Sequence, residues 1–186
     1  MTTLTKEAIR KSFMQLLNEK PVSKITVKEI VETCGINRNS FYYHYSDIPS
    51  LMEEILNEQA DMLLNVTKDM SIYECIMRAM NFALENKTAM MHIFNSANRD
   101  MLDRYLDRVA NRTVNGYFDV YFRDEDVCDE DKQAIVMYYK SLLIGFVIAW
   151  MRSGMNYDLR EQLQRLCELF EGSTETAVER SRKKTT

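Results

Sequence analysis

Hydrogen-bonding side chains crowd one short segment of this sequence, from Arg38 to Tyr45. On a helix, Phe41 and Tyr45 lie four residues apart, so both can face inward. The opposite side then carries Arg38, Asn39, Ser40, Tyr42, Tyr43 and His44. Arginine can donate two hydrogen bonds to a guanine, and tyrosine and histidine can donate to phosphates, so this face is predicted to read nucleic acid. Two alternatives stay open: Arg38 on a phosphate, and Tyr43 packed against the next helix.

Two short helices around a glycine turn are predicted to position this face. Thr26 and Glu29 have the spacing of a capping box, which begins a helix. Gly35 can adopt the left-handed conformation that ends that helix. Asn37 is a favourable N-cap for the next helix, so together they predict a helix-turn-helix.

The whole chain is predicted to be all-α. It has 186 residues with only 5 Gly and 2 Pro, too few for the many turns of a β-sandwich. Apolar spacing predicts further helices at about 5–18, 48–68, 72–85, 88–94, 98–122, 132–152 and 159–170. We expect an N-terminal three-helix helix-turn-helix domain (1–47), a larger C-terminal helical dimerisation and effector domain (48–172), and a flexible tail (173–186).

The charge is distributed unevenly along the chain. The net charge is −4, but residues 1–50 carry 7 Lys and Arg against 5 Asp and Glu. Residues 51–186 carry 17 basic against 23 acidic residues. Any contact with nucleic acid is therefore expected in the first fifty residues.

The N-terminal part of the sequence resembles the DNA-binding domain of TetR-family transcriptional regulators. The resemblance spans about Ile9 to Leu56 and is carried by two stretches, Thr26–Ile30 and Cys34–Tyr45. The residues from Gly145 to Met155 are similar to the penultimate helix of such proteins. The resemblance implies an all-helical homodimer that binds DNA and often a small molecule. Ile48 departs from the pattern, because many members have a phosphate-binding lysine there.

The resemblance also implies which residues meet DNA. Thr26 is expected at a phosphate, and Lys28 adds electrostatic attraction. Arg38, Asn39 and Ser40 are candidates for base edges, and Tyr42, Tyr43 and His44 for phosphate or sugar. The full predicted DNA-binding set is Thr26, Lys28, Asn37, Arg38, Asn39, Ser40, Tyr42, Tyr43 and His44.

An effector pocket in the C-terminal domain is expected to be lined by aromatic residues, methionine and the second histidine. The candidates are Met90, His92, Phe94, Tyr105, Phe118, Tyr121 and Tyr138. Core packing is the alternative for each of them, since such stripes at helical spacing are common in helical cores.

The last two predicted helices are candidates for a dimer interface. The first is apolar nearly all round, and a helix of that kind must be covered on all sides. Pairing with its twin and with the last helix would form a four-helix interface. The candidates are Leu142, Phe146, Ala149, Trp150, Leu159, Leu163, Leu166 and Phe170. A central helix within a monomer is the alternative.

Several function classes are expected to be absent. The four cysteines, Cys34, Cys75, Cys128 and Cys167, lie far apart without zinc-ligand spacing, so we expect neither metal nor disulfides. GxGxxG, P-loop, HExxH and GxSxG motifs are missing, so we expect no cofactor, catalytic residues or enzyme activity. No signal peptide or membrane span is predicted, and the protein is expected in the cytoplasm.

The sequence therefore predicts a homodimeric regulator that binds a near-palindromic double-stranded DNA operator. A repressor released by an effector in the C-terminal domain is the leading hypothesis. The alternative is a C-terminal domain that responds to a partner protein instead of a small molecule.

Overall fold

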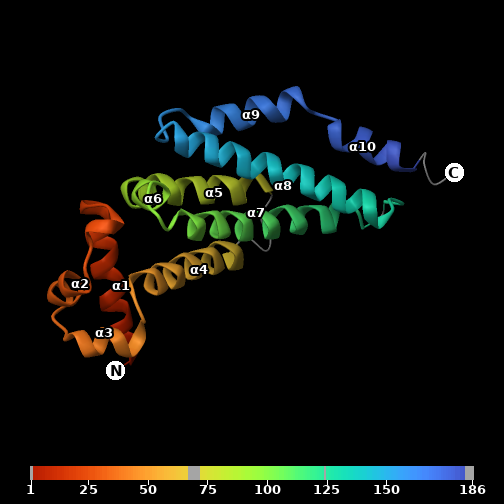
Figure 1. The fold of residues 1–186 in the computed structure, drawn as a ribbon. Helices are drawn as coiled ribbons and strands as arrows, with labels where there is room; N and C mark the ends of the chain where they lie inside the picture. The colour runs from red at the N-terminus through yellow and green to blue at the C-terminus, as the bar shows by residue number, and fades with distance from the viewer. Residues whose placement is uncertain (1, 67–71, 124, 183–186) are drawn as a thin grey trace. The chain divides into compact units, whose positions relative to one another are not determined.

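The computed structural model describes residues 2–66, 72–123 and 125–182 (Figure 1). The described residues are helical with short connections and contain no strand, as the sequence predicted. The helices are α1 (Thr2–Glu19), a 3₁₀ turn (Val22–Lys24), α2 (Val27–Cys34), α3 (Arg38–His44), α4 (Ile48–Val66), α5 (Ile72–Glu85), α6 (Lys87–Phe94), α7 (Arg99–Tyr121), α8 (Asp129–Arg152), α9 (Leu159–Leu169) and α10 (Ser173–Arg182).

The chain folds as two compact units. The first comprises the described parts of Met1–Asn65 and Ala79–Tyr105, and the second those of Val66–Arg78 and Leu106–Thr186. The first unit therefore holds α1 to α4 and α6, and the second holds α8 to α10. The predicted domain boundary after residue 47 stays a prediction.

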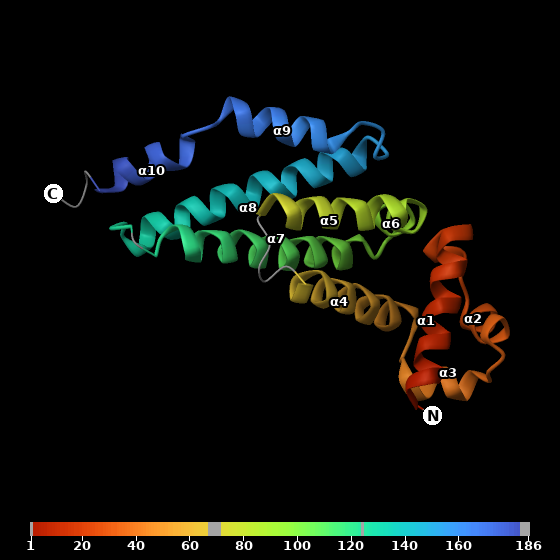
Figure 2. The ribbon, with the colours of Figure 1, turned by 180° about the vertical axis from the view of Figure 1, so that it is seen from behind.

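The N-terminal helices close around a small apolar core. Ile9, Phe13 and Leu17 of α1 are fully buried, as are Ile30 of α2 and Phe41 of α3. Their spacing on α1 is the i, i+4 pattern of one helix face, which explains why these residues meet the other two helices. Figure 2 shows α1, α2 and α3 gathered around this core.

A second core lies in the other unit and includes the end of the chain. Val114 and Phe118 of α7, and Phe122 just after it, pack with Val127 and with Val178 of α10. Within the predicted flexible tail (173–186), residues 173–182 form the helix α10, and residues 183–186 lie outside the described residues. Apolar contact of Val178 with α7 holds this helix, a tertiary effect that its polar sequence does not reveal.

Helix α8 is long, apolar and largely uncovered by its own chain. An 18-residue window in Asp129–Arg152 has a mean hydropathy of 1.7, and only 17% of it is buried. By length and composition alone, this one helix could cross a membrane. A single such helix is weak support for a membrane span, because helices of soluble proteins pass the same test.

Candidate nucleic-acid interface

The start of α2 is fixed by a capping box. The Thr26 Oγ1 accepts a hydrogen bond from the Glu29 backbone N–H at 3.3 Å, and the Thr26 N–H donates to Glu29 Oε2 at 3.0 Å. The Thr26 hydroxyl also donates to Glu29 Oε2 at 2.8 Å. Hydrogen bonds from Lys20 and then Thr26 lower the pKa of the Glu29 carboxyl to about 2. To donate to a phosphate as predicted, the Thr26 hydroxyl would therefore have to give up its hydrogen bond to Glu29.

The turn and the start of α3 follow the predicted signals. Gly35 has φ 70° and ψ 30°, the left-handed conformation that ends α2. The Asn37 Oδ1 caps α3 by accepting from the Ser40 N–H at 2.8 Å and from the Ser40 hydroxyl at 3.1 Å. Both side chains were predicted to contact DNA, and here they bond to each other. Their first role is to set where α3 begins.

The outer face of α3 is open to solvent. Arg38 and Asn39 are exposed, as are Tyr42 at 55% and Tyr43 at 78%. His44 is half-buried, with its ring edge-on to that of Tyr43 at 5.0 Å. Tyr43 is thus too exposed to pack against the next helix. Exposed aromatic rings with polar tips, next to an arginine and an asparagine, suit contact with bases and phosphates.

The inner face of α3 is held by a polar network that the sequence analysis missed. The Tyr45 hydroxyl donates to Glu54 Oε1 of α4 at 2.7 Å, and burial raises the pKa of Tyr45 to about 12. Lys6 Nζ lies 2.6 Å from Glu54 Oε2, and Arg10 bonds to both Glu54 and Glu58. Two basic residues at i, i+4 spacing on α1, Lys6 and Arg10, face two acidic residues at the same spacing on α4, Glu54 and Glu58, and these matching charges could have indicated the ion pairs.

The surface beside α3 carries further charges. Lys28 is exposed and lies 3.8 Å from Glu32 one turn along α2, a pair that solvent screens. Ile48, at the position where many TetR-family members have lysine, begins α4 and is half-buried. The predicted DNA-binding residues therefore lie on one helix-turn-helix, and three of them, Thr26, Asn37 and Ser40, take part in its capping hydrogen bonds.

The predicted effector residues are divided between the two units. Met90, Phe94 and Tyr105 are core residues of the first unit, with exposures of 5%, 6% and 7%. His92 Nδ1 lies 2.7 Å from the Leu17 carbonyl oxygen, so this nitrogen carries the proton and fastens α6 to α1. Met90 also lines a cavity of about 80 Å³ in the first unit, and an effector role for these four residues stays a prediction. Phe118, Tyr121 and Tyr138 belong to the second unit, where Phe118 lines a groove and Tyr138 is 54% exposed.

Two of the predicted dimer residues are inaccessible to a partner. Trp150 and Leu159 are each only 1% exposed within the single chain. The Trp150 Nε1 donates to the Tyr157 carbonyl at 3.0 Å, so this indole holds the turn between α8 and α9. Leu142, Ala149 and Phe170 are exposed, and the remaining three are half-buried: Phe146, Leu163 and Leu166. The prediction was wrong for Trp150 and Leu159, because α8 also has a side that packs on its own chain.

A helix-turn-helix whose second helix is exposed to solvent is the arrangement of a DNA-binding protein. Residues 9–55 match the family model of bacterial regulatory proteins of the tetR family. Residues 70–172 match the family model of a transcriptional regulator C-terminal region. The chain belongs to the TetR family of transcriptional regulators. Members of this family are transcription factors and not enzymes, so this chain is a DNA-binding regulator.

Solved structures share the fold along most of the chain. The dihydroxyacetone kinase operon activator DhaS has a TM-score of 0.77 at 16% identity, over 94% of this chain and 98% of that one. A TetR regulator from Rhodococcus sp. RHA1 has a TM-score of 0.59 at 13% identity, over 92% and 98%. A regulator from Aquifex aeolicus VF5 has a TM-score of 0.56 at 20% identity, over 89% and 99%. At these identities the likeness concerns the fold.

Proposed function

We propose that the protein acts as a homodimer that binds a near-palindromic operator and represses transcription until an effector releases it. The observation that carries the proposal is the outer face of α3, where Arg38, Asn39, Tyr42 and Tyr43 are exposed together. Two copies of this face, about 34–36 Å apart, would enter successive turns of the major groove.

Dimerisation is supported by the uncovered side of α8. On that side, six exposed residues recur at helical spacing and are apolar or small: Ala134, Tyr138, Ser141, Leu142, Gly145 and Ala149. The other exposed residues of α8 are Asp129, Glu130, Gln133, Met137 and Arg152. A Cβ added at Gly145 would meet no atom within 4 Å, so a partner helix has room to approach there. A largely apolar stripe of this kind is best buried by its own symmetry mate.

Control by an effector requires two states of the dimer. A ligand changes DNA affinity only if it binds the DNA-competent and incompetent arrangements with different affinity. Repression then follows when the operator overlaps a promoter.

An activator is the second candidate. The operon activator DhaS shares this fold over 94% of the chain, so the same architecture also serves activation in that protein. The two roles use the same DNA-binding face and differ in where the operator lies relative to the promoter.

Selection from a random duplex DNA pool at physiological salt tests the proposal. The expected product is a near-palindrome whose half-sites are centred about one helical turn apart. A reporter that carries this sequence at a promoter then separates repression from activation. Recovery of no enriched sequence by folded, dimeric protein would contradict the proposal.

A further inference from the structure

A groove between α7 and α8 in the second unit has a lining unlike the rest of that unit. Its volume is about 570 Å³, within the range of small-molecule sites. Three cationic residues line it, Arg123, Lys132 and Lys140, against the single acid Asp119. Residues 51–186 as a whole carry 23 acidic against 17 basic side chains. Basic side chains therefore outnumber acidic ones in the lining itself, the reverse of the balance in the domain, and the attraction for an anion depends on how strongly the two lysines are already paired.

The floor of the groove is apolar and rigid. Phe118 and Phe122 stack with ring centroids 5.0 Å apart and are 2% and 8% exposed. Val136 of α8 is half-buried and lines the same groove. Only the edges of the two rings reach the groove, so they give it a narrow apolar floor.

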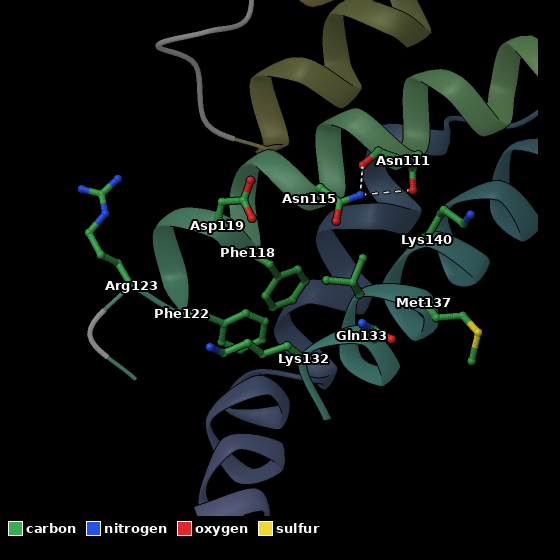
Figure 3. Close-up of a pocket in the computed structure, with 11 residues that line it drawn as sticks. Asn111, Asn115, Phe118, Asp119, Phe122, Arg123, Lys132, Gln133, Met137 and Lys140 are labelled. Carbon is green, nitrogen blue, oxygen red and sulfur yellow. Dashed lines mark hydrogen bonds between the residues drawn. The ribbon is translucent and has the colours of Figure 1, made fainter. Parts of the chain in front are cut away.

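The two lysines differ in how firmly they are held. Lys140 Nζ lies 3.2 Å from Asp107 Oδ1, whereas Lys132 Nζ lies 3.9 Å from Asp129 Oδ1, whose side chain is 90% exposed. Figure 3 shows the Lys132 side chain beside Phe122, and Arg123 pointing away from the other labelled residues. Lys132 is thus the cation best placed to accept a new anionic partner over the aromatic floor.

The α7 wall offers hydrogen-bond acceptors. The Asn115 Nδ2 donates to the Asn111 carbonyl at 2.7 Å and to Asn111 Oδ1 at 3.1 Å (Figure 3). The Asn115 Oδ1 and the Asp119 carboxylate are then the polar atoms that a ligand meets on this wall. A ligand with an N–H or O–H group would complement them.

The geometry points to an effector site in this groove for an apolar anion, with its acid group on Lys132 and its apolar part against Val136 and the exposed edges of Phe118 and Phe122. The inference rests on the proposed control by an effector and assigns it a place and a ligand class. An aromatic carboxylate or sulfonate that also has an N–H or O–H donor fits these walls.

The probe is 1-anilinonaphthalene-8-sulfonate, compared with N-phenyl-1-naphthylamine, which has the same rings without the sulfonate. We expect saturable fluorescence with one sulfonate probe per chain and about tenfold weaker binding of the neutral probe. Lys132→Ala should weaken the sulfonate probe about tenfold and leave the neutral probe unchanged, whereas Lys132→Arg should retain binding. Arg112→Ala, an exposed cation of α7 outside the groove, is the matched control.

Equal binding of the two probes, or sulfonate binding that survives Lys132→Ala, would overturn the inference. If Leu142→Glu weakens binding of the sulfonate probe and Lys132→Ala does not, the probe binds to the exposed side of α8, and the inference is also overturned. The DNA selection is run without probe, so its failure would count against the proposed function alone. Enriched DNA with no charge-selective probe binding would count against this groove alone.

Discussion

The Tyr45 hydroxyl donates a 2.7 Å hydrogen bond to Glu54 Oε1 and so joins the C-cap of the recognition helix to α4. Arg10 of α1 bonds to the same carboxylate, so three helices share one polar network. The orientation of α3 is thereby coupled to α4, the helix that follows it along the chain. Its outer face, with Tyr42 and Tyr43, is exposed to solvent.

Removal of this hydroxyl is expected to destabilise the protein. Tyr45→Phe keeps the buried ring but leaves Glu54 with only Lys6 and Arg10, and we expect a loss of about 1.5 kcal/mol in the free energy of unfolding. Denaturant unfolding measures it. Tyr43→Phe is the matched control, because Tyr43 is 78% exposed on the same helix. That control should leave stability unchanged and weaken DNA binding, and an equal loss of stability in both variants would contradict the network.

Local signals explain why the helix-turn-helix could be predicted from sequence. Thr26 with Glu29, then Gly35, then Asn37 each act within a few residues, and the structure has each of them in its predicted capping or turn role. The Tyr45–Glu54 contact depends on how two helices pack, and no short-range pattern specifies it.

Tertiary contacts explain what the sequence analysis missed. Helix α10 is stabilised by Val178 in the core of the second unit, and the Ser181 hydroxyl donates to Asp131 at 2.5 Å across 50 residues of chain. Trp150 was assigned to a dimer interface because α8 is apolar nearly all round. Only the fold shows which side of that helix its own chain covers.

Base-reading and phosphate-binding residues are expected to differ in their effects on DNA binding. Arg38→Ala should relax the preference at one base pair by about 1–3 kcal/mol. Lys28→Ala should weaken all sequences alike and lower the slope of log affinity against log salt by about one per subunit. Competition with single-base variants of the selected DNA, at several salt concentrations, measures both. If Arg38→Ala lowers the affinity for all the DNA variants equally, Arg38 binds a phosphate and not a base.

The exposed side of α8 is expected to carry the dimer. Leu142 is 39% exposed, and Leu142→Glu would place a charge in the apolar stripe at little cost to the folded chain. We expect a monomer in sedimentation and a loss of operator affinity, because two half-sites are no longer bound together. Leu84→Glu on α5, where Leu84 is 46% exposed, is the control and should remain a dimer. A dimeric Leu142→Glu protein would place the interface elsewhere.

Acid is expected to weaken the start of α2 through Glu29. The pKa of this carboxyl falls from 4.5 to about 2 in the folded chain, chiefly through the hydrogen bond from Lys20. A lowered folded-state pKa means that the contribution is full above pH 4.5 and is lost as the pH falls towards 2. Glu29→Gln should therefore lower the Tm at neutral pH, and its difference from the parent should shrink between pH 4.5 and 2. Glu32→Gln, whose side chain is 63% exposed one turn later, is the control and should change the Tm little. A difference for Glu29→Gln that stays constant down to pH 2 would show that the helix does not depend on the ionised carboxylate.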